Sequence, residues 1–194
     1  MTKPRDPERT AWFDAAVQYA VDCHRGQMRK GSDAPYIVHP LRVGLTLQLH
    51  GFAEPVVIAG LLHDVVEDCG IALAELAARF DERVAALVEA VTEPDKSKPW
   101  DVRKRESLDR MDHSDADALA IKAADALDNV RSILADHAVL GPAVWERFTR
   151  GAEQQAWYYG EVAARVVRGL GGRPLARELA GAAAELACVV AADR

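Results

Sequence analysis

The chain of 194 residues carries 24 Lys and Arg against 30 Asp and Glu, a formal net charge of −6, and 49% of its residues are hydrophobic. These proportions exclude wholesale disorder, and the acidic balance argues against non-specific nucleic-acid binding. The longest uncharged apolar runs, at 56–62 and 186–192, are too short to span a membrane. The N-terminus lacks an apolar signal segment, so we expect a cytoplasmic protein with no membrane or nucleic-acid partner.

Abundant alanine and the lack of alternating β-branched runs predict an all-α fold of roughly eight to ten helices. Glycine and proline punctuate the chain and mark where these helices end. We expect helices at residues 7–23, 40–49, 55–69, 73–80, 82–91, 101–111, 116–136, 143–168 and 175–191. No linker or composition shift separates them, which predicts a single domain over residues 1–194.

Two histidines and two aspartates form a candidate metal site. His39 precedes a predicted helix, His63 and Asp64 are neighbours on the predicted helix 55–69, and Asp125 lies on another helix. Together they offer a mixed nitrogen and oxygen donor set. Such a set suits manganese, iron or zinc and lacks the thiolates of structural zinc sites.

Two further acidic residues follow this candidate site on the same predicted helix. Glu67 comes four residues after His63, and Asp68 comes four residues after Asp64, so one helical face repeats acidic groups. Like charges this close destabilise a helix unless a cation binds. Acidic groups beside an activated water are what general acid–base catalysis requires, so we predict that Glu67 and Asp68 are catalytic.

Two segments are locally basic in this acidic chain, residues 24–30 and residues 96–105. The second is as consistent with a solvated surface as with a phosphate-binding role. If it binds phosphate, Lys98 and Arg105 are the residues that we predict to do so. Late in the chain, Trp157 is expected to pack in the core.

Several motifs occur in order along the chain. They are His24-Arg-Gly-Gln-Met-Arg-Lys-Gly31, Pro35-Tyr-Ile-Val-His-Pro40, His63-Asp-Val-Val-Glu-Asp68, Val91-Thr92 and Ile121-Lys-Ala-Ala-Asp-Ala-Leu-Asp-Asn129. In these motifs the sequence resembles the HD-domain hydrolases of the RelA/SpoT-homologue group, in particular the small stand-alone alarmone hydrolases. The resemblance covers residues from about 12 to about 168 and implies an HD-domain helical bundle. The predicted helix 175–191 lies outside it.

The resemblance also implies a reaction and its residues. The family removes the 3′-pyrophosphate of guanosine tetra- or pentaphosphate, giving GDP or GTP plus pyrophosphate. One Mn²⁺, or another divalent metal, would be bound by His39, His63, Asp64 and Asp125. Glu67 and Asp68 would position and activate the attacking water. Contacts to the nucleotide and its phosphates would come from Arg29, Lys30, Asn129 and Tyr159.

Departures from the family pattern keep other functions open. Cys69 replaces a threonine, and Asp128 occupies a position that is often His or Tyr. These changes question the substrate more than the metal, so the nucleotide could instead be an adenosine alarmone or NADPH. A nucleotide-binding HD module without turnover is a further alternative, against which the Glu67–Asp68 pair argues. A helical interaction protein has no use for the candidate metal site.

Overall fold

The computed structural model describes residues 7–31, 33–93 and 95–194. Within these residues the chain forms ten α-helices and one 3₁₀ helix, which confirms the all-α prediction. They are α1 (Pro7–Cys23), α2 (Val38–Leu49), α3 (Glu54–Leu61), α4 (Val65–Cys69), α5 (Leu73–Arg79), α6 (Glu82–Val91), α7 (Trp100–Met111), α8 (Ala116–Leu140), η1 (Gly141–Arg147), α9 (Gly151–Leu170) and α10 (Pro174–Ala192). No helix in the described ranges is both long and apolar enough to cross a membrane.

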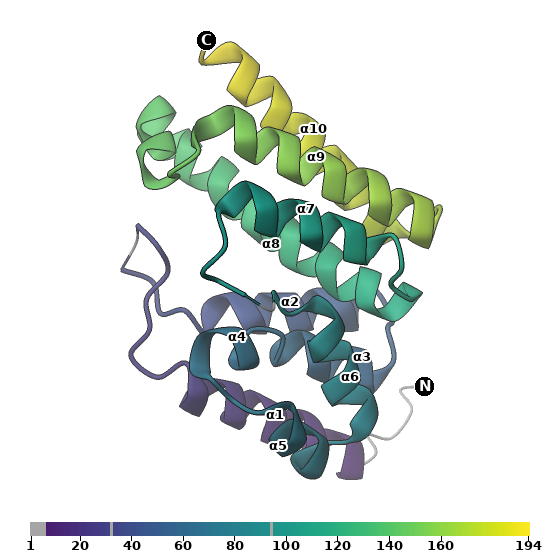
Figure 1. The fold of residues 1–194 in the computed structure, drawn as a ribbon. Coiled ribbons are helices and arrows are strands. Elements are labelled where there is room, and N and C mark those ends of the chain that lie inside the picture. The colour runs from purple at the N-terminus through teal and green to yellow at the C-terminus, as the bar shows by residue number, and fades with distance from the viewer. Residues whose placement is uncertain (1–6, 32, 94) are drawn as a thin grey trace, which may run out of the picture.

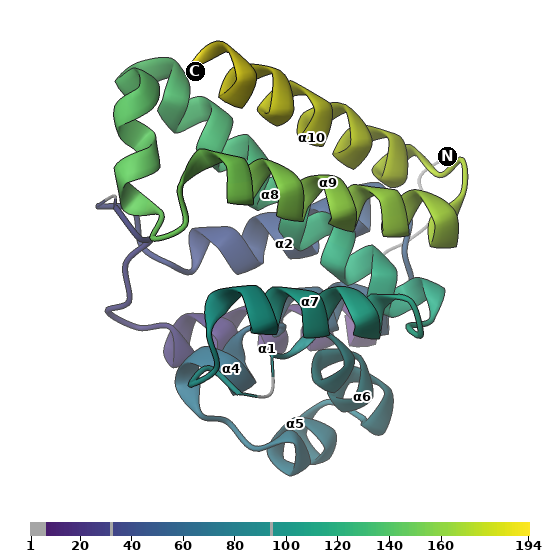
Figure 2. The same ribbon diagram turned by 45° about the horizontal axis from the view of Figure 1, so that its top comes forward.

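The long helix α8 lies at the centre of the fold. It packs against α2, α3 and α6 on one side and against α9, α10 and η1 on the other. Figures 1 and 2 show α9 and α10 running side by side at one end of the molecule, with α1 to α6 toward the other end. The carboxylate of Asp115 caps the start of α8 by accepting the backbone N–H of Ala118 at 2.8 Å.

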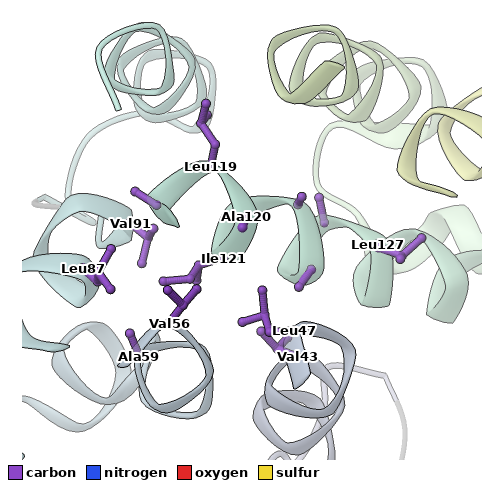
Figure 3. Packing of buried hydrophobic residues seen from close by; sticks show 14 of the residues in the cluster. Val43, Leu47, Val56, Ala59, Leu87, Val91, Leu119, Ala120, Ile121 and Leu127 are labelled. Carbon is purple, nitrogen blue, oxygen red and sulfur yellow. The ribbon is translucent and has the colours of Figure 1, made fainter. Parts of the chain in front are cut away.

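Buried hydrophobic side chains from all ten described α-helices form one connected core. Figure 3 shows Ile121 of α8 pointing toward Val56 of α3, with Val43 and Leu47 of α2 beside them. Burial of each such side chain contributes roughly 1.5–3 kcal/mol of hydrophobic stabilisation. The core therefore joins α2 and α8, which carry His39 and Asp125, to α3, whose end leads into His63 and Asp64.

Helices α2 and α3 approach each other closely through two glycines. A side-chain carbon added at Gly44 would overlap Leu61, and one added at Gly60 would overlap Leu47. Each glycine thus provides the space into which a leucine of the other helix fits. This reciprocal contact brings the start of α2 near the end of α3.

Two of the helix predictions are wrong in the same way. Each predicted one continuous helix where the structure has an interruption. The predicted helix 143–168 begins instead as the 3₁₀ helix η1, and α9 starts only at Gly151. Gly151, the first residue of α9, has φ of +71°, a left-handed conformation through which a regular α-helix cannot continue, so the chain turns between η1 and α9. The predicted helix 55–69 is broken between Leu61 and Val65.

Candidate active site

The break between α3 and α4 carries His63 and Asp64. The sequence-based prediction of a continuous helix here is wrong, since the backbone leaves helical geometry at Leu62, with φ of −109° and ψ of 5°. The ring of His63 is anchored by a hydrogen bond from Nδ1–H to the carbonyl oxygen of Gly60 at 2.9 Å. Because the helix is interrupted, the two neighbouring side chains can face one point, which adjacent positions of a regular helix do not.

His39 at the start of α2 and Asp125 in the middle of α8 meet these two residues. Nε2 of His39 lies 3.3 Å from Oδ1 of Asp125 and 3.7 Å from Oδ2 of Asp64. Nε2 of His63 lies 3.0 Å from Oδ2 of Asp64. Donor atoms of His39, His63 and Asp125 all lie within 4.8 Å of one another. The structure therefore brings together the four residues predicted as metal ligands, here called the metal cluster.

The metal cluster has the chemistry of a divalent-cation site. Nε2 of His63 is buried and has no hydrogen-bond partner, although Asp64 is close to it. Burial alone would lower the pKa of His63, but the adjacent Asp64 carboxylate outweighs it and raises the pKa to about 9. Burial likewise opposes protonation of His39, yet hydrogen bonds to Asp125 and Asp128 raise its pKa. The cluster thus favours added positive charge, and its nitrogen and oxygen donors could hold a divalent metal.

Polar side chains around the cluster hold its carboxylates in place. Tyr36 donates its hydroxyl hydrogen to Oδ2 of Asp64 at 2.6 Å. Asn129 donates to Oδ1 of Asp125 at 2.6 Å, and Lys122 donates to Oδ2 of the same residue at 3.2 Å. Tyr36 and Lys122 were not predicted as site residues, although both lie inside recognised motifs. Their spacing of three residues from His39 and Asp125 is the signal that could have identified them.

The acidic pair Glu67 and Asp68 lies on α4 beside the metal cluster. Oε2 of Glu67 accepts the backbone N–H of Glu93 at 3.1 Å, which ties α4 to the segment after α6. Lys96 forms ion pairs with both carboxylates, at 3.3 Å from Oε1 of Glu67. Burial disfavours the charged lysine, but Asp68 and Glu67 outweigh it and raise the pKa of Lys96. The predicted catalytic pair is therefore bridged by one cation.

A polar cavity of about 220 Å³ joins the cluster and the acidic pair. Its polar and charged lining comprises Tyr36, His39, His63, Asp64, Glu67, Asp68, Glu93, Lys104, Lys122, Asp125, Asn129, Tyr158 and Tyr159. Such a lining suits a charged ligand better than an apolar one. Tyr159, predicted as a nucleotide contact, is buried against this space. Trp157, which we expected in the core, is 37% exposed and contacts the ring of Trp100.

The predicted phosphate-binding residues are distributed unevenly around the cavity. Arg29 donates to Oδ1 of Asn129 at 3.1 Å and so lies next to the site. Lys30 and Arg105 are exposed and do not line the described cavity. Lys98 also lies outside the lining and pairs with Glu106 at 2.7 Å.

Lys104, which the sequence analysis did not single out, lines the cavity instead. Its Nζ lies 2.6 Å from Oε1 of Glu93 and 4.8 Å from the centre of the Tyr158 ring. Arg103 contacts the other oxygen of Glu93 at 2.5 Å. Burial opposes ionisation of Glu93, but these two cations outweigh it and lower its pKa. No local sequence signal distinguishes Lys104 from its basic neighbours, because its ion pair with Glu93 forms only in the folded chain.

Comparison with known proteins places the chain in a family. A model of the HD domain matches residues 16–148. The mouse guanosine-3′,5′-bis(diphosphate) 3′-pyrophosphohydrolase MESH1 is 38% identical over 160 residues, covering 81% of this chain and 83% of that protein. A GTP pyrophosphokinase of Streptomyces coelicolor is 41% identical over 124 residues, but the match spans only 14% of that longer protein.

Solved structures agree with this placement. One described as a metazoan ortholog of SpoT that hydrolyses ppGpp aligns with a TM-score of 0.71, 32% identity and 96% coverage of both chains. The Listeria monocytogenes protein lmo0812 aligns with a TM-score of 0.71 and 34% identity, covering 80% of this chain and 99% of that one. The chain therefore belongs to the HD domain family, in one group with the MESH1 proteins.

Proposed function

We propose that the protein is a metal-dependent hydrolase that removes the 3′-pyrophosphate of guanosine tetra- and pentaphosphate, yielding GDP or GTP and pyrophosphate. The observation that carries the proposal is the meeting of the metal cluster with Glu67 and Asp68 in one polar cavity. The names of the MESH1 relatives, which cover most of the chain, support this choice of substrate.

The metal cluster is proposed to hold one divalent ion, with Mn²⁺ as the first candidate. The buried, unpartnered Nε2 of His63 and the carboxylates of Asp64 and Asp125 support this assignment. When bound, such an ion would supply Lewis-acid activation of water and of a phosphoryl oxygen.

The side chains of the protein transfer the proton and stabilise the phosphate charge. Glu67 or Asp68 takes the proton of the attacking water at a carboxylate oxygen and returns it to the leaving group. Both carboxylates are already held in place by Lys96. Positive side chains around the cavity, Arg29, Lys104 and Lys122, offset the charge that develops on the phosphate oxygens.

Recognition of the rest of the nucleotide is proposed for residues at and beyond the cavity. Asn129 and Tyr159 line the cavity, which supports a role for them in contacting the nucleoside. Lys30, Lys98 and Arg105 lie outside the lining, so any contact they make would be with parts of the substrate that extend past it. We place the reaction in the cytoplasm, with a small nucleotide as the substrate and no nucleic-acid or membrane partner. The connected core supports a single domain over residues 1–194.

The test is incubation of the purified protein with guanosine tetraphosphate and Mn²⁺, followed by chromatography of the products. Release of GDP and pyrophosphate by the wild type, but not by Asp64→Ala or after addition of EDTA, is the expected result. Parallel reactions contain an adenosine alarmone and NADPH. Turnover of one of these alone would reassign the substrate, and metal binding without any turnover would leave a nucleotide-binding module.

A further inference from the structure

Asp128 lies behind the metal cluster rather than inside it. Its side chain is 9% exposed, and it is not among the described residues that line the cavity. Oδ2 of Asp128 lies 2.7 Å from Nδ1 of His39, a buried contact that joins α8 to the start of α2. In the sequence this residue departs from the family pattern, and in the structure its partner is His39.

The contact with Asp128 determines which nitrogen of His39 can bind a cation. A neutral imidazole has one N–H donor and one lone pair. When Nδ1–H is donated to the carboxylate, the lone pair is left on Nε2, the atom that faces Asp64 and Asp125. A carboxylate in this place also makes the imidazole a stronger donor. His63 differs, because its Nδ1 meets the neutral carbonyl oxygen of Gly60.

Two arginines make the buried charge of Asp128 tolerable. The guanidinium of Arg29 lies 3.7 Å from Oδ2, and that of Arg42 lies 3.8 Å from Oδ1. Arg29 also donates to Asn129, which in turn donates to Asp125. The acidic residue is thus held between cations on one side and the imidazole of His39 on the other.

We propose that Asp128 is a positioning residue for His39 and sets the affinity of the metal cluster for a divalent cation. The inference rests on the metal site of the proposed function but not on its substrate. Replacing the carboxylate by an amide keeps the shape of the side chain and removes the charge that fixes and strengthens the imidazole donor.

The experiment is a calorimetric titration of Mn²⁺ alone into EDTA-stripped protein, without nucleotide. We expect Asp128→Asn to weaken Mn²⁺ binding by about 10- to 100-fold, the usual effect of losing such a partner. Asp136→Asn is the matched control, because this aspartate lies further along α8 and pairs with Arg147 away from the cluster. Its Mn²⁺ affinity should equal that of the wild type. Thermal melts in EDTA check that both variants are folded.

A second variant tests the same charge from the other direction. Arg42 is exposed, so Arg42→Met should fold, and it removes a cation that offsets Asp128. Its Mn²⁺ affinity is expected to be equal to that of the wild type or tighter by up to about fivefold. Wild-type affinity in Asp128→Asn, or clearly weaker binding in Arg42→Met, would overturn the inference.

The outcomes separate this inference from the proposed function. Weakened Mn²⁺ binding in Asp128→Asn supports the inference even if the wild type hydrolyses no guanosine tetraphosphate. Equal Mn²⁺ binding in both proteins refutes the inference while turnover still supports the proposed function. A wild-type protein that binds no Mn²⁺ refutes both the metal site and the role of Asp128.

Discussion

The two sides of the cavity satisfy their charges differently. On the ligand side, formed by α2, the α3–α4 break and α8, imidazoles and carboxylates converge, and the buried Nε2 of His63 makes no hydrogen bond but lies 3.0 Å from Oδ2 of Asp64. The α7 side is formed by Glu93 together with residues 95–105. Here each of three lysines is paired with a carboxylate of the same chain: Lys96, Lys98 and Lys104.

The difference lies in how the charged groups on the two sides are partnered. On the ligand side the carboxylates accept hydrogen bonds from Tyr36, Asn129 and Lys122, and an added cation there would be stabilised by the two aspartates. The α7 side is neutralised internally, so a substrate phosphate there must compete with Glu93 or with the Glu67–Asp68 pair. A count of basic residues along the sequence therefore exceeds the number of basic side chains that can bind an anion without first breaking an ion pair.

The largest effect is expected from breaking the ligand side itself. Asp64→Ala removes the carboxylate between the two imidazoles, so Mn²⁺ content should fall sharply and turnover should drop below detection. Metal content is measured by mass spectrometry and turnover by product release. Asp14→Ala, an exposed change on α1, serves as the control. A variant that keeps both metal and activity would show that the cluster is not the catalytic centre.

A smaller but still large effect is expected for the acidic pair. Glu67→Gln keeps an oxygen that can accept the backbone N–H of Glu93 but cannot take a proton from water. We expect kcat to fall by roughly 10²- to 10⁴-fold while KM and Mn²⁺ affinity change little. Asp68→Asn, measured alongside it, shows which of the two carries the proton. An unaltered kcat in Glu67→Gln would exclude this residue from the mechanism.

The α7 side can be tested with two adjacent basic residues. Lys104 lines the cavity and Arg105 is exposed outside it, so Lys104→Met should lower kcat/KM by about 10- to 100-fold and Arg105→Met should not. Steady-state kinetics on both variants decide the point. A comparable loss in Arg105→Met would instead support the sequence-based prediction and place substrate phosphates beyond the cavity.

The smallest effect on kcat/KM is expected for Lys96, and Lys98 of the same loop is its control. Lys96 pairs with Glu67 and Asp68, whereas Lys98 pairs with Glu106. Because Lys96 is half-exposed, losing its ion pairs should lower kcat/KM by only about two- to fivefold. Lys98→Met should have no effect of this kind. The gap between wild type and Lys96→Met should narrow at high salt, which screens exposed charges. Equal kinetics of both variants at low salt would refute this role for Lys96.

The sequence could predict the ligand side because metal chemistry allows few residue types. His39, His63, Asp64 and Asp125 were predicted as metal ligands from donor type and motif, and the fold brings their side chains together. The interruption after Leu61 could not be predicted, since the apolar pattern of residues 56–65 continues with helical spacing across it.

The α7 side was not predictable for a different reason. Whether a lysine lines the cavity depends on which carboxylate it pairs with. The ion pair between Glu93 and Lys104 depends on how α7 packs after α6, which the sequence does not show. Asp128 stood out in the sequence as an unusual residue. Its partner is 89 residues away, so its contact with His39 required the structure.

The glycine contact between α2 and α3 has a consequence for the position of His63. The carbonyl oxygen that orients His63 belongs to Gly60, the residue that rests on Leu47 of α2. A side chain at position 60 would overlap the end of Leu47, so this leucine would have to shift beside the residue whose carbonyl orients the imidazole. The rings of His39 and His63, with centres 5.2 Å apart, thus lie close to a packing contact made by a leucine outside the metal cluster. A substitution at Gly60 or Leu47 is therefore expected to alter the position of His63 while every candidate ligand residue is left unchanged.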